Sequence, residues 1–243
     1  MEPAREGVRK PREKDSTTPT CAATGHRRLA LVYRGPASQP GCPEAVAELL
    51  ASTAWNLDVR FTGPDEVLPL AARTLSRAAL YAQPGGGTLS SAYRRLRWQR
   101  RAVRDFVHHG GRYLGFCLGG YLAGATPGFG LLPGDTDQYI SSPGATVHDG
   151  RDTVIQVTWR GRPRTVFFQD GPLFVLDEGA DARILATYDN GAAAALVTRY
   201  GGGRVAVTGP HPEATADWYT DHALPIQHTR DLAQELVEAV MRE

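Results

Sequence analysis

The stretch that decides the fold is Gly111-Arg-Tyr-Leu-Gly-Phe-Cys117-Leu-Gly-Gly-Tyr-Leu-Ala-Gly124. Its first half has the residues of a short buried strand, and an apolar run typical of a helix follows Cys117 directly. A strand that turns straight into a helix holds its corner residue in a strained conformation, and glycines beside the corner let the backbone pass closely. The positive end of the helix dipole also favours a thiolate over a thiol at such a corner. Cys117 is therefore a candidate nucleophile, although a small buried hydrophobe at the end of a core strand explains it equally well.

Short apolar runs around that stretch predict more strands of the same sheet. In the first half of the chain the predicted strands cover residues 28–33, 57–61, 78–82 and 112–116. Helices are predicted between them over residues 44–52 and 90–109. Strands that alternate with helices indicate a doubly wound sheet, which binds ligands at the carboxyl ends of its parallel strands. The loops expected at that edge are Arg34–Pro43, Gln83–Gly87 and Cys117–Gly120.

The second half of the chain has a different pattern. Residues 126–150 are rich in Gly, Pro and Asp and predict an excursion over the surface. Alternating residues over 153–159 and 164–168 predict an antiparallel hairpin that turns at Gly161–Pro163. Three further strands and a closing helix are predicted over residues 184–188, 193–200, 204–208 and 230–242. The predicted fold class is α/β: a doubly wound, mostly parallel, flavodoxin-like sheet flanked by helices, with an antiparallel β extension in the second half.

Length and composition predict one globular domain behind a charged tail. The chain has 243 residues, of which 42% are hydrophobic and 22% are charged. Residues 1–27 lack a periodic apolar pattern and predict a disordered tail, whereas residues 28–243 predict a single α/β domain. Because the chain has only three cysteines, no apolar run long enough to span a membrane and no signal peptide, we expect it to be cytoplasmic.

The charge of the chain bears on its partners. A formal net charge of +1 gives no reason to expect a polyanionic partner. Arginines crowd the predicted helix 90–109, but apolar residues at core spacing on the same helix favour a solvated outer face over a nucleic-acid patch. We expect a small-molecule substrate or an amide-bearing metabolite, no nucleic acid, no membrane, no metal and no other cofactor. The sequence is compatible with a homodimer as well as with a monomer.

Near the end of the chain lie a candidate base for the thiol and a candidate carboxylate that would orient this base. His211 lies just after a predicted strand, between two prolines and two residues before Glu213. A thiol nucleophile needs such a base, and the base needs an orienting group. Gly85-Gly86-Gly87 offers amides without side chains, and with the amide of Leu118 these would form an oxyanion hole. Taken separately, the glycines could be only a turn, and His211 only a loop histidine.

Taken together, these motifs carry a resemblance to a known family. The stretches concerned are Leu31-Val-Tyr-Arg-Gly-Pro36, Gln83-Pro-Gly-Gly-Gly87, Gly115-Phe-Cys-Leu-Gly-Gly-Tyr121, Phe168-Gln-Asp-Gly-Pro172 and Gly203-Arg-Val-Ala-Val-Thr-Gly-Pro-His-Pro-Glu213. They resemble class I glutamine amidotransferase-like domains, and most closely the branch found at the N-terminus of eukaryotic biotin–protein ligases and as free-standing bacterial proteins. The resemblance implies an amidotransferase-like α/β domain with Cys117 as nucleophile, His211 as base and Glu213 as orienter. It does not imply biotin ligation.

Tyr121 departs from the pattern of the glutaminases in this class. Those enzymes have Gln four residues after the cysteine, where it helps to hold glutamine, whereas the biotin-ligase-like branch has an aromatic residue there. We therefore expect a cysteine-dependent amidase or amidotransferase-like hydrolase whose substrate is not glutamine in the ordinary way. The alternatives are a non-catalytic ligand-binding or regulatory module on the same fold, and a thiol enzyme of another class that acts on a biosynthetic intermediate.

Other residues near the expected site allow two interpretations each. Gln169 and Asp170 follow a predicted strand and are candidates for substrate contact with Gly85 and Tyr121, although a turn accounts for them equally well. Cys42 faces the same edge but has no base nearby in sequence, which favours an ordinary loop residue.

Overall fold

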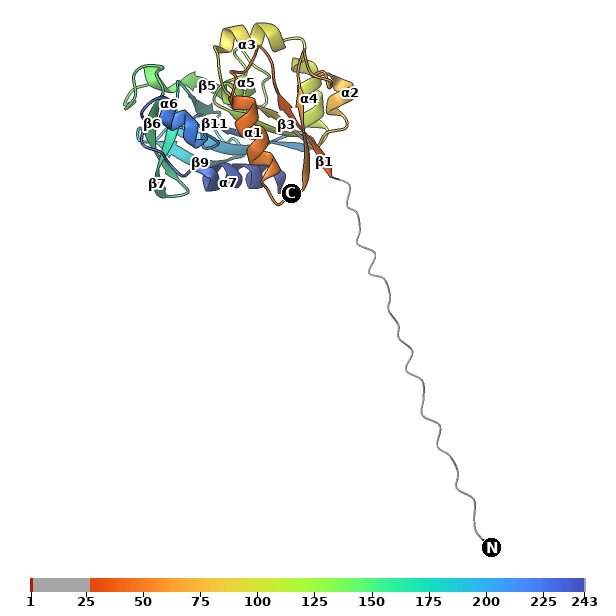
Figure 1. Ribbon diagram of the computed structural model, residues 1–243. Coiled ribbons are helices and arrows are strands. Elements are labelled where there is room, and N and C mark those ends of the chain that lie inside the picture. The colour runs from red at the N-terminus through yellow and green to blue at the C-terminus, as the bar shows by residue number, and fades with distance from the viewer. Residues whose placement is uncertain (2–26, 243) are drawn as a thin grey trace.

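Eleven strands form one mixed sheet, and the strand that leads into Cys117 lies inside its parallel part. Figure 1 shows this sheet with helices packed around it. The computed structural model describes Met1 and residues 27–242, so almost all of the predicted tail 1–27 lies outside the described residues. The strands are β1 (Arg28–Tyr33), β2 (Leu57–Thr62), β3 (Leu80–Gln83), β4 (Arg112–Phe116), β5 (Gly134–Gln138), β6 (Thr153–Trp159), β7 (Arg162–Phe168), β8 (Pro172–Leu176), β9 (Ala182–Tyr188), β10 (Ala193–Tyr200) and β11 (Gly203–Thr208).

The order of the strands divides the sheet into two parts. The sheet runs β2-β1-β3-β4-β11-β10-β9-β6-β7, with β8 paired to β10 and to β5. The strands from β2 to β11 are parallel to one another, and every pair from β11–β10 onward is antiparallel. This arrangement confirms the predicted α/β fold class, with its parallel first half and antiparallel extension.

Helices cover both faces of the parallel part, and the sheet separates the two hydrophobic cores that they form with it. They are α1 (Cys42–Ala51), α2 (Ala72–Leu75), α3 (Leu89–Leu96), α4 (Arg100–His108), α5 (Leu118–Ala123), α6 (Ala216–Asp221) and α7 (Arg230–Met241). Successive strand residues point to opposite faces. Thus Ala30 and Val32 of β1 pack with α1 and α7, whereas Leu31 and Tyr33 pack with the side of the sheet that α3, α4 and α5 cover.

The predicted helix over residues 90–109 is wrong in one respect, because it is broken into α3 and α4. Residues 97–99 form a turn in which the amide of Gln99 bonds the carbonyl of Leu96 at 2.9 Å. No proline or glycine marks this break, so tertiary packing sets it. The arginines of α4 are also not all solvated, since the Arg104 guanidinium donates to the carbonyl oxygens of Phe129 and Gly130 at 2.7 and 2.5 Å.

The second half of the chain contains elements that the sequence pattern did not indicate. Residues 126–150 are not only a surface excursion, because β5 lies within them and pairs with β8. The hairpin of β6 and β7 turns at Arg160-Gly161, both with positive φ (47° and 77°), and not at Gly161–Pro163. Pro163 lies instead within β7, the edge strand, where a missing amide donor is tolerated. The helices α2 and α6 and the strand β8 were also not predicted.

Cys117 stands at the sharp corner that the sequence predicts. It lies between β4 and α5 with φ 47° and ψ −103°, a left-handed conformation that is costly for a residue with a side chain. The tight turn depends on Gly119, because a methyl group there would lie 2.0 Å from the carbonyl oxygen of Gln83 at the end of β3. Glycine therefore lets α5 lie directly against the edge of the neighbouring strand.

Candidate functional site

Three loops meet at the carboxyl edge of the sheet because β3, β4 and β11 are neighbours. The loop after β3 contains Gly85–Gly87, β4 leads into Cys117, and β11 leads towards His211 and Glu213. β4 and β11 pair in parallel along their whole length, and the amide of Cys117 extends the ladder by donating to the carbonyl of Thr208 at 2.8 Å. The register of the sheet thus brings distant parts of the chain to one place.

Cys117 and His211 lie beside each other above Gly85. A methyl group on Gly85 would lie 2.5 Å from Cε1 of His211 and 3.4 Å from both Nε2 of His211 and Cβ of Cys117. The Cys117 side chain also raises the pKa of His211 by its charge and by a hydrogen bond. Position 85 thus requires glycine, since any side chain there would displace the imidazole.

His211 is bonded to Glu213 on its other ring nitrogen. Nδ1 of His211 lies 2.8 Å from Oε1 of Glu213, and the two residues are only 2% and 6% exposed. Burial by itself lowers the pKa of His211, but the charges of Glu213 and Cys117 and the hydrogen bonds to them outweigh it and raise the pKa to about 10. The imidazole is therefore held in its protonated form by the carboxylate behind it.

The loop that carries His211 is fixed by groups that sequence reasoning missed. The amide of His211 donates to the carbonyl of Phe167 at 2.8 Å, and the imidazole packs edge-on against Phe167 and Trp218. The hydroxyl of Thr229, just before α7, donates to the carbonyl of Pro212 at 3.0 Å. Trp218 belongs to α6, a short helix without a clear apolar pattern, so nothing in the sequence pointed to it.

A cavity of about 700 Å³ has Cys117, but not His211, in its wall. Gly86, Gly87 and Leu118 line it together with Cys117, and the two glycines have φ of 101° and 82°. The amides of these three residues donate to no protein acceptor within the described part of the chain. They are free donors beside the thiol, as an oxyanion hole requires. Gly85, by contrast, lies under the imidazole and not in the wall of this cavity.

Tyr121 and Asp170 form the polar wall of the same cavity. The hydroxyl of Tyr121 is buried and has no partner among the described residues, and burial, followed by the charges of Asp170 and Cys117, raises its pKa strongly. Asp170 has φ 45°, and both of its carboxylate oxygens accept a bond from Nε2 of Gln138 at 2.9 Å. Burial raises the pKa of Asp170, and the bond from Gln138 opposes this effect. Gln138 lies in β5 and was not among the predicted site residues.

Gln169 and Cys42 lie at the border of the site. The carbonyl of Gln169 accepts a bond from the Cys117 thiol at 3.4 Å, so this residue contacts the candidate nucleophile through its backbone. Cys42 is buried at the first turn of α1, and burial, more than the nearby charges of Glu213 and Cys117, raises the pKa of its thiol far above the usual range. Cys42 therefore remains a neutral thiol near neutral pH.

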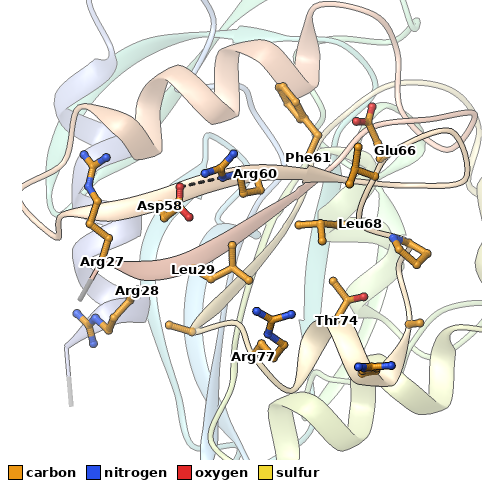
Figure 2. Close-up of a pocket in the computed structure, with 15 residues that line it drawn as sticks. Arg27, Arg28, Leu29, Asp58, Arg60, Phe61, Glu66, Leu68, Thr74 and Arg77 are labelled. Atoms are coloured by element: carbon orange, nitrogen blue, oxygen red, sulfur yellow. Dashed lines mark hydrogen bonds and ion pairs between the residues drawn. The ribbon is translucent and has the colours of Figure 1, made fainter.

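A larger cavity, of about 1100 Å³, lies elsewhere, along the edge strand β2 (Figure 2). Apolar side chains such as Leu29, Phe61 and Leu68 line it, with arginines around them, and Arg60 is paired with Asp58. None of the predicted site residues lies in its wall. Among the described residues, no group of three His, Cys, Asp or Glu side chains could hold a metal, and no helix is long and apolar enough to cross a membrane.

Comparison with known proteins finds a family similarity over part of the chain. Residues 30–145 match the family described as biotin–protein ligase, N-terminal. Over these residues the chain is similar to that family. The matched part includes Cys117 and the glycine loop but ends before His211 and Glu213. A biotin–protein ligase of Schizosaccharomyces pombe is 29% identical over 164 residues, which cover 57% of this chain and 26% of that protein. The chain thus spans about a quarter of the length of this relative.

Solved structures with low sequence identity show the same fold. A glutamine amidotransferase is similar with a TM-score of 0.59 and 16% identity, over 87% of this chain and 98% of that one. A glutamine amidotransferase from Thermotoga maritima has the same TM-score and identity, over 90% of this chain and all of that one. The fold is therefore glutamine amidotransferase-like, as the sequence motifs predict.

Proposed function

We propose that this protein is a cysteine-dependent amidase or amidotransferase-like hydrolase in which Cys117, His211 and Glu213 form a triad. The observation that carries the proposal is the buried arrangement of three groups in series. The thiol stands at a strained corner, the imidazole lies beside it above Gly85, and the carboxylate holds the far ring nitrogen at 2.8 Å. The amidotransferase-like fold and the family relation support this function without specifying a substrate.

The reaction follows from the positions of these groups. The sulfur of Cys117, whose proton has passed to His211, attacks the carbonyl carbon of an amide, and the free amides of Gly86, Gly87 and Leu118 stabilise the negative charge that develops on the oxygen. His211 gives its proton to the departing nitrogen as the C–N bond breaks, which leaves a thioester on Cys117. Water then attacks the thioester, and its proton passes through His211 to the sulfur, so that the acid is released and the thiol restored.

One observation favours the alternative of a non-catalytic ligand-binding or regulatory module. The thiol of Cys117 donates its hydrogen bond to the backbone carbonyl of Gln169, at 3.4 Å. In that hydrogen bond the sulfur keeps its proton, as it would in a binding module, and does not pass it to His211. The two functions differ in whether a covalent acyl group ever forms on Cys117.

That difference is measured directly with an activated acyl donor. We expect p-nitrophenyl acetate to acetylate Cys117, as seen by intact mass and peptide mapping, because the thiol lies in a cavity beside free amide donors. Cys42 is the matched control within the same chain, since its buried neutral thiol should stay unmodified. Equal modification of the two cysteines, or none on Cys117, would contradict the proposal and favour the binding module.

Glutamine itself should be a poor substrate. The ring of Tyr121 occupies the wall of the Cys117 cavity and presents a buried hydroxyl where glutaminases of this class have a side-chain amide. We expect ammonia release from glutamine to stay near the background rate, measured by a coupled dehydrogenase assay with the Cys117→Ala variant as the blank. Saturable release of ammonia well above that blank would show that Tyr121 does not exclude glutamine.

A further inference from the structure

Two cavities, not one, meet at the candidate nucleophile and base. Cys117 lines the cavity of about 700 Å³ described above, and His211 lines a second one, of about 250 Å³. Neither residue lines the cavity of the other. The walls that both cavities share are formed by Gln39, Gly86 and Gln169. A bound substrate that reaches both groups must therefore cross between these three residues.

The different roles of Cys117 and His211 in the reaction assign one part of the substrate to each cavity. The thiol and the free amides act on the carbonyl group, so the acyl part lies in the cavity of Cys117. The imidazole must protonate the departing nitrogen, and a proton donor has to lie within hydrogen-bond reach of that atom. The amine part therefore lies in the cavity of His211. This assignment rests on the proposed function.

The size of the second cavity indicates what kind of amine it takes. A molecule as small as water or ammonia fills only about 30 Å³ of liquid volume. A cavity of about 250 Å³ is several times larger and is closed on one side by the rings of Phe167 and Trp218. Ammonia would leave most of it unfilled, whereas an amine that carries an alkyl chain would not.

The charged side chains in the wall of the second cavity indicate what further group the amine carries. Asp152, Asp217 and Asp221 line the second cavity, and its basic side chains are His211 and His222 alone. His222 lies 3.4 Å from Asp152, but the carboxylates of Asp217 and Asp221 have no partner among the described residues. These two stand one turn apart on α6, where like charges repel each other. A second positive charge on the amine would relieve that repulsion.

We propose that the substrate is an N-substituted amide whose leaving amine occupies the His211 cavity and carries a second, positively charged group. In the forward step the S–C bond forms, the C–N bond breaks, and the proton of the imidazolium passes to the departing nitrogen. In the reverse step an amine nitrogen attacks the thioester carbon, loses one proton to Nε2 of His211, and releases the Cys117 sulfur. The same cavity therefore governs which amines can take the acyl group back.

The reverse step provides the test. The protein is incubated with p-nitrophenyl acetate and with ammonia, propylamine, 1,3-diaminopropane or β-alanine, each at the same concentration of unprotonated amine. The ratio of acetylated amine to acetate is measured, with non-enzymatic acetylation subtracted. We expect propylamine to exceed ammonia, and 1,3-diaminopropane to exceed propylamine about twofold to fivefold, the factor expected for exposed charge pairs. β-Alanine, which brings a carboxylate, should give the lowest ratio.

Variants of the second cavity test whether its carboxylates cause the preference for the diamine. In the Asp217→Asn/Asp221→Asn double variant, the preference for the diamine over propylamine should fall to near one. Asp105→Asn is the matched control, because Asp105 is an exposed carboxylate of α4 that lines neither cavity. If acetyl-Cys117 forms but the product ratio does not depend on the amine, this inference fails and the proposed function stands. If no acetyl-Cys117 forms, both fail.

Discussion

Replacing His211 by Ala is expected to reduce the rate of Cys117 acylation by a factor of about 10³ or more, since thiol and base act as one unit. The imidazole is buried beside the thiol, above Gly85. Stopped-flow release of p-nitrophenol, with the acyl-enzyme confirmed by mass, measures this rate. Such a loss would separate an enzyme from a ligand-binding module, in which the same substitution leaves ligand affinity largely intact.

The control for that experiment is an exposed histidine remote from the site. His109→Ala removes an imidazole at the end of α4, where its Nδ1 contacts only a backbone carbonyl. We expect this variant to acylate at the rate of the unmodified protein. If the two histidine variants behave alike, His211 has no role as a base.

The second large effect concerns stability. Glu213→Gln should lower the free energy of unfolding by about 3 kcal/mol near pH 6, because it leaves a buried imidazolium without its carboxylate. The pKa of His211 is raised from 6.5 to about 10. Its pairing with Glu213 therefore stabilises the fold fully below about pH 6.5, and this contribution is lost as the pH rises through about 10. The difference between variant and unmodified protein should accordingly shrink between these two pH values.

Urea unfolding at a series of pH values measures this difference. The matched control is Glu48→Gln, which breaks an ion pair with Arg230 whose side chains are 62% and 47% exposed. Exposed pairs contribute about 0–1 kcal/mol, so this variant should differ little from the unmodified protein at any pH. A Glu213→Gln variant whose loss of stability is the same at pH 6 and pH 10 would show that Glu213 does not hold the proton on His211.

The parallel half of the sheet could be predicted because local pattern and tertiary structure agree there. The apolar run of β1 and the glycine-flanked corner at Cys117 each indicate a structure that packing then preserves. The break between α3 and α4 could not be predicted, since residues 97–99 contain no helix breaker. β5 and β8 were missed for a related reason, since Asp and Gly residues fill β5 and the strand forms only through its pairing with β8.

The candidate site likewise contains residues that the sequence indicates and residues that it does not. Cys117, His211, Glu213 and the glycine loop are marked in the sequence by residue type and by glycine or proline neighbours. Trp218 and Gln138 are not marked, because each acts only through a contact made across the fold. Nor does any pattern in the sequence indicate that one cavity borders the thiol and a second borders the imidazole, because their walls come from loops after several different strands.

The pairing of β4 with β11 also fixes the order in which the site is assembled during synthesis. Cys117 leaves the ribosome long before His211, and at about 5–20 residues per second the delay is roughly 5 to 20 seconds. During that time the thiol has no base beside it, because His211 reaches it only when β11 joins β4. The nascent chain therefore lacks the pairing of thiol and imidazole, and the proposed acyl transfer begins only once His211 has joined Cys117.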